Sequence, residues 1–164
     1  MPNSDRHTIG YIIERFGPAA SVAVWLFASY VFRGWFVENI ASGKIILGGL
    51  FSAVFGWAAI QTGFLFSVFG FVATKGDGFI GEIRGSPVMK RFQWYVLQAM
   101  YMGFILTIYS IPLMILNLDM KGSITYWVVS TWFASFIWAF TSFLRVALNF
   151  GKMVSVKDAD FIPG

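Results

Sequence analysis

Four long stretches without a charged residue dominate this sequence and limit what the chain can fold into. A helix needs roughly 20 mostly apolar residues to cross a hydrocarbon core about 30 Å thick. The uncharged stretches cover residues 16–32, 45–74, 92–118 and 122–144. We therefore predict an all-α membrane protein with a single domain, residues 1–164. Its four transmembrane helices are expected at about 18–37, 45–74, 88–118 and 122–150.

The composition agrees with lipid as the main solvent of this chain. Only 12% of the residues are charged and 57% are hydrophobic, whereas soluble domains carry about 25% charged residues. The net charge of +4 does not indicate a nucleic-acid partner, because the basic residues cluster at the ends of the apolar stretches. The expected partner is the lipid bilayer, with no direct contact to nucleic acid.

The basic residues are distributed unequally between the two sides of the predicted bundle. Cytoplasmic segments of membrane proteins carry an excess of Lys and Arg. One side holds the amino terminus, the middle loop and the tail, with Arg6, Arg15, Lys75, Arg84, Lys90, Arg91, Arg145, Lys152 and Lys157. The other side holds Arg33, Lys44 and Lys121. Nine against three predicts that both termini are cytoplasmic (N-in/C-in). We expect the first span to be retained rather than cleaved as a signal peptide.

The segment before the first span shows helical amphipathicity. Ile9, Ile12, Ile13 and Phe16 follow the i, i+3, i+4, i+7 spacing of one helical face. This predicts an amphipathic N-terminal interfacial segment that ends where the chain turns at Gly17 and Pro18. Such a segment is either a sensor of the membrane surface or a polar leader that rests its apolar side on lipid. We favour the second interpretation.

Small residues recur along one face of the second span. Helices in lipid gain no hydrophobic drive from meeting each other, so close backbone approach at small residues supplies the dispersion contacts. The small-residue stripe consists of Gly49, Ser52, Gly56, Ala59, Gly63, Ser67 and Gly70. We predict that another helix packs against this stripe. A helix of the same chain is favoured and a second copy is the alternative, and we expect the protein to form homo-oligomers.

The loop between the second and third spans is short and rich in glycine. Ser86 followed by Pro87 is a good cap and first-turn pair for the next helix. We expect the apolar residues of this loop to form its tip, with basic residues around them. The candidate cytoplasmic partner surface consists of Phe79, Ile80, Ile83, Arg84, Lys90 and Arg91.

Polar side chains inside the spans allow two interpretations. The candidate pore-lining residues are Gln61, Thr131, Ser135 and Ser142. In a homo-oligomer they could line a polar path. The alternative, which we favour, is that they make hydrogen bonds between helices, worth about 0.6 kcal/mol each on average.

Catalytic chemistry has few possible carriers in this sequence. There is no cysteine, and His7 is the only histidine, so metal sites and nucleophile–histidine pairs are disfavoured. The predicted span cores hold no ionisable residue, although ion-coupled transporters and proton relays depend on such groups. We predict no catalytic residue, no metal site and no cofactor, and therefore a protein that is not an enzyme.

One segment resembles a known group of proteins. Residues 70–74 (Gly-Phe-Val-Ala-Thr), Phe79 and Ile80, Arg84, Ser86 and residues 90–92 (Lys-Arg-Phe) are similar to uncharacterised small four-span bacterial membrane proteins. The resemblance covers about a quarter of the chain. It implies a bacterial inner membrane and no particular activity.

Taken together, these features favour a non-enzymatic membrane subunit that anchors or scaffolds a cytoplasmic protein partner, for example in a bacterial defence or stress system. The alternative is a homo-oligomeric pore or a membrane-permeabilising effector. An anchor should conduct no ions, whereas a pore should, so these two hypotheses are separable by experiment.

Overall fold

The chain forms five helices over the residues that its computed structural model describes, namely 4–75, 81, 83, 85–116, 118–120 and 122–155, with side chains from Phe16 onward. In chain order they are α1 (Ser4–Val31), α2 (Arg33–Ala41), α3 (Leu47–Thr74), α5 (Pro87–Ile115) and α6 (Ser123–Val154). No strand occurs in these ranges. The fold is all-helical, as predicted.

Three of the helices are long and apolar enough to cross a membrane. These are α3, α5 and α6, and the count rises to four if α1 from Phe16 and α2 together form one bent span. At 1.5 Å per residue, the three long helices measure about 42–48 Å, more than a hydrocarbon core of about 30 Å. Their ends therefore extend into the headgroup regions of the bilayer. The chain is accordingly an integral membrane protein.

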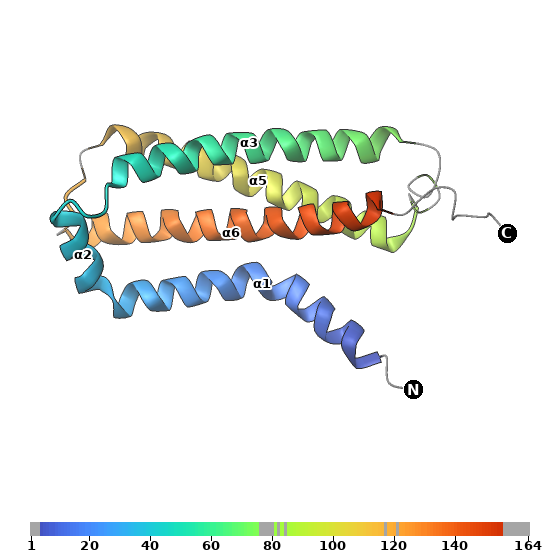
Figure 1. Ribbon diagram of the computed structural model, residues 1–164, viewed down its shortest axis with the longest axis horizontal. Helices are drawn as coiled ribbons and strands as arrows, with labels where there is room; N and C mark the ends of the chain where they lie inside the picture. The colour runs from blue at the N-terminus through green and yellow to red at the C-terminus, as the bar shows by residue number, and fades with distance from the viewer. Residues whose placement is uncertain are drawn as a thin grey trace.

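The first predicted span is not one straight helix. The chain breaks at Phe32, and α2 is bent by 73° from the part of α1 that precedes it. In Figure 1, α2 lies across the end of the bundle instead of continuing α1. Residues 35–37 therefore do not continue the first span as a straight helix, and they belong to it only if the span is bent at Phe32. Arg33 and Glu38 explain the break, because a helix lying across the bundle end keeps both charges out of the hydrocarbon.

The predicted turn at Gly17 and Pro18 is also wrong, because α1 is helical through both residues. Proline lacks a backbone N–H and its ring crowds the preceding turn, which bends a helix without always ending it. Figure 1 shows that α1 is bent and that its amino-terminal part diverges from the bundle. The side chains of Ile9, Ile12 and Ile13 lie outside the described residues.

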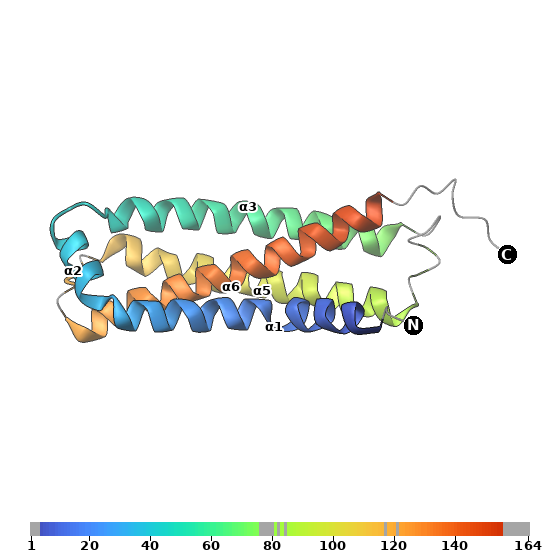
Figure 2. The ribbon, with the colours of Figure 1, turned by 60° about the horizontal axis from the view of Figure 1, so that its bottom comes forward.

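The long helices run side by side, with α6 crossing the bundle obliquely (Figure 2). The main helix pairs are α3 with α5, α5 with α6, and α6 with α1. Helix α1 therefore lies at the edge of the assembly and packs mainly on α6. Both the start of α1 and the end of α6 lie at the same end of the molecule (Figure 2).

The core holds large aromatic side chains whose polar atoms are bonded. Trp132 is fully buried, donates from Nε1 to Ser110 Oγ over 2.9 Å, and meets Phe51 edge to face at 4.7 Å. The hydroxyl of Tyr126 on α6 donates to the carbonyl of Ser29 on α1. Unpaired polar groups are costly in lipid, so these bonds allow aromatic residues to fill the interior.

Candidate functional site

The small-residue stripe of α3 faces away from the other described helices. Ser52, Ala59, Gly63 and Ser67 are exposed, and a methyl group added to Gly56, Gly63 or Gly70 would meet nothing within 4 Å. The expectation that a helix of the same chain packs on the stripe is therefore wrong. The remaining members, Gly49 included, lie on the same outward side. Packing of a second copy of the chain on this side is the alternative that stays open.

Helix α3 packs through a different face, which contains Ala58, Gln61, Thr62 and Leu65. At its centre α3 approaches α5 at Gly103, where an added methyl group would collide with the Thr62 hydroxyl. The amide nitrogen of Gln61, a residue only 2% exposed, lies 3.4 Å from the carbonyl oxygens of Ala99 and Ala139. Gln61 thus joins α3 to both α5 and α6 in the middle of the bundle.

The four candidate pore-lining residues do not share one path. Gln61 and Ser142 are buried inside the bundle, whereas Thr131 is exposed. Thr131 donates within α6 to the carbonyl of Trp127 over 2.9 Å, and Ser135 donates to the carbonyl of Thr131 over 3.0 Å. Hydroxyl groups that are bonded to their own helix need no water beside them.

The candidate partner surface is described in part. Phe79, Ile80 and Arg84 lie outside the described residues. Ile83 packs against the hydrophobic core, while Lys90 and Arg91 are exposed. The predicted cap is confirmed: Ser86 Oγ accepts a hydrogen bond from the Met89 backbone N–H over 3.2 Å, and Pro87 opens α5.

A buried arginine is the main polar feature that sequence reasoning missed. Arg145, which follows the last uncharged stretch, was counted with the basic tail, but α6 continues to Val154 and leaves Arg145 only 8% exposed. One guanidinium nitrogen donates to Gln98 Oε1 over 2.9 Å, and the guanidinium carbon lies 3.8 Å from the centre of the Tyr95 ring. Gln98 in the third span was the signal that could have predicted this pair, because an amide inside a span needs a polar partner at the same depth.

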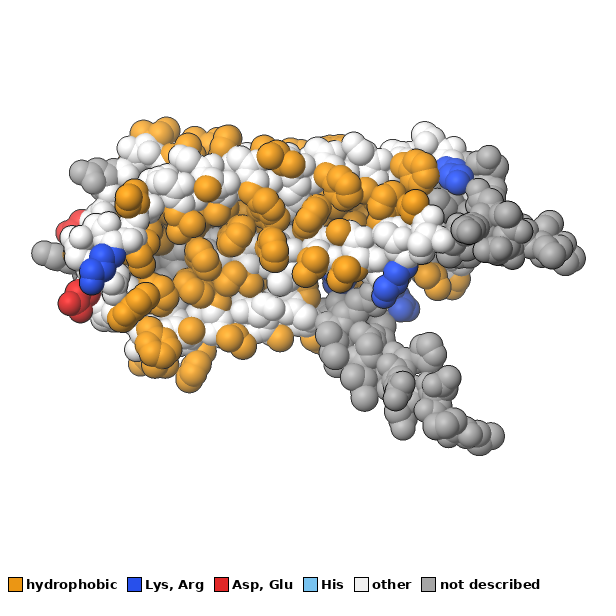
Figure 3. Space-filling view, viewed as in Figure 1, with side chains coloured by type: hydrophobic (Ala, Val, Ile, Leu, Met, Phe, Trp, Pro, Cys, Tyr) orange, Lys and Arg blue, Asp and Glu red, His pale blue; other side chains and the backbone are white. Residues whose placement is uncertain are grey.

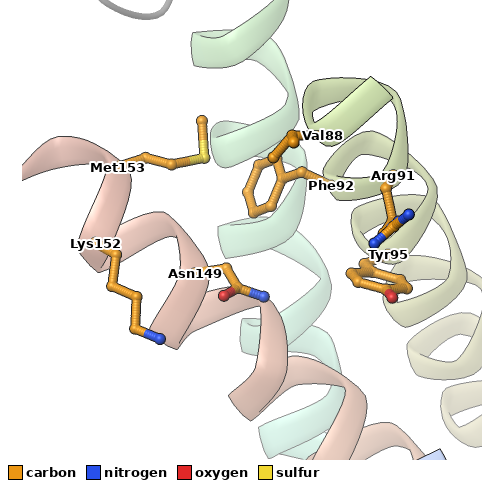
Figure 4. Close-up of a pocket in the computed structure, with 7 residues that line it drawn as sticks. All are labelled: Val88, Arg91, Phe92, Tyr95, Asn149, Lys152 and Met153. Atoms are coloured by element: carbon orange, nitrogen blue, oxygen red, sulfur yellow. The ribbon is translucent and has the colours of Figure 1, made fainter. Parts of the chain in front are cut away.

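A pocket of about 230 Å³ lies between the start of α5 and the end of α6. Figure 4 shows its lining from both helices, with the Asn149 amide pointing from α6 toward the Tyr95 ring of α5. Its lining residues are Val88, Arg91, Phe92, Tyr95, Asn149, Lys152 and Met153. The pocket therefore combines two cationic side chains, one amide and an aromatic wall.

The two ends of the bundle differ in charge. At the end that holds this pocket, every charged side chain that the structure describes is basic: Lys75, Lys90, Arg91, Arg145 and Lys152. The opposite end carries both signs, with Arg33, Lys44, Glu38 and Asp119. Among the coloured side chains on the face drawn in Figure 3, acidic ones lie at the end formed by α2, and the flanks are largely hydrophobic. Among the described side chains, the end that holds the pocket therefore carries only positive charge, while the neighbouring segments outside the described residues contain both signs in the sequence.

Among the described residues, no group of three or more acidic or histidine side chains could hold a metal ion. No protein-family model, curated protein or solved structure matches the chain. The resemblance to small four-span bacterial proteins therefore stays an expectation. What the fold and the described side chains define is a helical membrane protein with a cluster of basic residues at one end.

Proposed function

We propose that this chain is a non-enzymatic membrane subunit that anchors or scaffolds a cytoplasmic protein partner, with its basic end in the cytoplasm. The observation that carries the proposal is the unequal distribution of Lys and Arg, with nine in the amino terminus, middle loop and tail and three on the other side. Basic residues accumulate on the cytoplasmic side of membrane proteins, and a positive surface steers acidic partners toward it. The resemblance of residues 70–92 supports a bacterial inner membrane as the location.

The packing of the interior supports an anchor over a transporter. Some buried polar side chains join neighbouring helices, as Gln61 does when its amide nitrogen lies between backbone carbonyls of α5 and α6. The aromatic residue Trp132, in the first third of α6, has no exposed surface. A rigid, closely packed bundle suits a protein that holds a partner in place.

Charge reversal at the candidate partner surface tests the proposal. The variant carries Glu at Arg84, Lys90 and Arg91, and the matched control carries Glu at Arg33 and Lys44 on the opposite end. We expect the triple variant to lose co-purifying protein at least about tenfold, because that loss needs only about 1.4 kcal/mol of repulsion. The control variant should retain its co-purifying protein.

A topology measurement separates loss of binding from loss of orientation. A reporter that is active only in the cytoplasm should be active after Gly164 and silent at Ser42, in the wild type and in both variants. The proposal fails if the triple variant keeps its orientation and also keeps its partner. Activity at Ser42 with silence after Gly164 would reverse the proposed orientation.

A homo-oligomeric pore is the second candidate, favoured by the exposed Thr131 on α6 and the half-buried Ser135 one turn further. It ranks second because both hydroxyls already donate to their own helix. Purified protein in liposomes should conduct no ions if it is an anchor. Ion flux that disappears when Thr131 and Ser135 are replaced by valine would favour the pore.

A further inference from the structure

We infer that the pocket between α5 and α6 binds the phosphate of an anionic phospholipid headgroup. The headgroup would enter between the first turns of α5 and the last turns of α6, where Arg91 and Lys152 contribute to the lining. This inference needs no protein partner and is therefore independent of the function proposed above.

The pocket lies at the depth of lipid headgroups. Measured along α6 from Ser123, Arg145 lies at about 33 Å and Asn149 at about 39 Å, at 1.5 Å per residue. The hydrocarbon core is about 30 Å thick, and the bilayer with its headgroup regions is about 40–45 Å. With the hydrocarbon core taken to begin at Ser123, Arg145 lies near its far edge and Asn149 lies among the headgroups. The exposed Trp94 on α5 agrees, because tryptophan is enriched at this interface.

The charges around the pocket favour an anion. Arg91 and Lys152 reach it from two different helices, and Arg145 lies one turn deeper on α6, held by Gln98 and Tyr95. The start of α5 adds the positive end of a helix dipole of 29 residues. The last carbonyl groups of α6 oppose this, but Lys152 lies in that last turn. Charge-assisted hydrogen bonds from Lys and Arg to phosphate are among the strong ones.

The size and the mouth of the pocket favour a lipid over a soluble acidic ligand. Its volume of about 230 Å³ is below the range of about 300–1,000 Å³ typical of pockets for whole drug-sized ligands. It suits a compact headgroup whose acyl chains remain outside. Val88 at the rim is 71% exposed, while Phe92 and Tyr95 are buried. An apolar rim beside a pocket lined by cationic side chains matches a phospholipid, in which apolar acyl chains adjoin a charged phosphate.

Native mass spectrometry of the full chain tests this inference. The purified protein is delipidated in mild detergent and offered equal amounts of phosphatidylglycerol and phosphatidylcholine, and the bound lipids are counted. We expect one phosphatidylglycerol to be retained in preference to phosphatidylcholine. Inorganic phosphate at millimolar concentration should not displace it. Displacement by inorganic phosphate would identify a site for a free anion and overturn the lipid as the occupant.

Two variants and one control locate the binding. Lys152→Gln should lower the preference for phosphatidylglycerol about fivefold, the effect of removing one cation near a membrane surface. Asn149→Asp keeps the side-chain shape, adds a negative charge, and should lower the preference at least as much. Lys44→Gln, an exposed cation at the opposite end, should leave it unchanged.

Besides displacement by inorganic phosphate, three results would overturn the inference. The first is the same preference for phosphatidylglycerol in the wild type and in Lys152→Gln. The second is a loss of this preference in Lys44→Gln as large as in Lys152→Gln. The third is no preference in the wild type. Thermal unfolding in the same detergent checks that the variants are folded. Lys152 is exposed, so Lys152→Gln alone decides the question if Asn149→Asp unfolds.

Discussion

The contact between α3 and α5 at Gly103 can be tested by adding a single methyl group. In Gly103→Ala the new Cβ would collide with Thr62 Oγ1, while Thr62 Cβ and Gln61 Nε2 would each lie at an ordinary 3.7 Å. The conflict therefore comes from one oxygen atom. That oxygen is held in place, because it donates to the Ala58 carbonyl over 2.8 Å.

The expected cost follows from the two ways in which this conflict can be relieved. Separating the helices is overpacking, which costs about 1–3 kcal/mol. Rotating Thr62 away breaks its hydrogen bond and leaves a buried hydroxyl unsatisfied, which also costs about 1–3 kcal/mol. Alanine gains about 1 kcal/mol over glycine inside a helix. Gly63→Ala on α3 receives the same gain but meets nothing within 4 Å, so the two variants should differ by about 1–3 kcal/mol.

Unfolding in detergent micelles, followed by tryptophan fluorescence, measures this difference. Gly103→Ala should unfold more easily than Gly63→Ala, and combining Gly103→Ala with Thr62→Ala should recover most of the loss. Such recovery is the coupling expected between residues in direct contact. Equal stability of the two single variants, or no recovery in the double variant, would refute the argument that α3 and α5 meet at this point.

Three further predictions concern α3 and α6. Gly63→Leu should leave the unfolding midpoint of a single chain unchanged, since its surroundings are open, but should reduce the native mass from oligomer to monomer. Phe66→Leu on the same helix should change neither the unfolding midpoint nor the native mass. A lowered unfolding midpoint at unchanged mass would contradict this. Arg145→Leu should lower the free energy of unfolding in detergent by about 1.5–3 kcal/mol. Adding Gln98→Leu should restore part of this loss, and simply additive losses would rule out a coupling between the two side chains. Trp132→Phe should lower the same free energy of unfolding by about 1 kcal/mol, because the hydrogen bond from the indole N–H to Ser110 is lost.

The lengths of the uncharged stretches predicted most of the fold. The second span was expected at 45–74 and α3 covers Leu47–Thr74, and the predicted start of the third span lies within one residue of Pro87. The limits of α3 agree because a charge in hydrocarbon is costly, so Lys44 and Lys75 lie near its ends. The start of α5 agrees because Ser86 and Pro87 cap it, while Lys90 and Arg91 lie inside the helix. The break at Phe32 was missed because the prediction carried the first span past Arg33 to residue 37.

The packing faces were harder to predict, for a physical reason. In water, the buried face of a helix is the apolar one, but a helix in lipid is apolar on all sides. Small residues show where a close approach is sterically allowed and not where it occurs. On α3 both the small-residue stripe and the face with Ala58 and Leu65 follow helical spacing. The contact that selects the second face is Gly103, forty residues away in the sequence, and a single sequence cannot reveal that pairing.

The position of α1 at the edge of the bundle has a consequence for how the protein is made. Trp25 Nε1 donates to the Ser130 carbonyl over 3.0 Å, and Tyr126 donates to the Ser29 carbonyl. Both bonds join α1, an early helix to leave the ribosome, to α6, the last of the five. Until α6 arrives, the indole N–H of Trp25 has lipid or interfacial water as its neighbour. Docking of α1 is thus a late step of biogenesis, and a chain interrupted before α6 would leave its amino-terminal helix as an isolated span, exposed to membrane quality control.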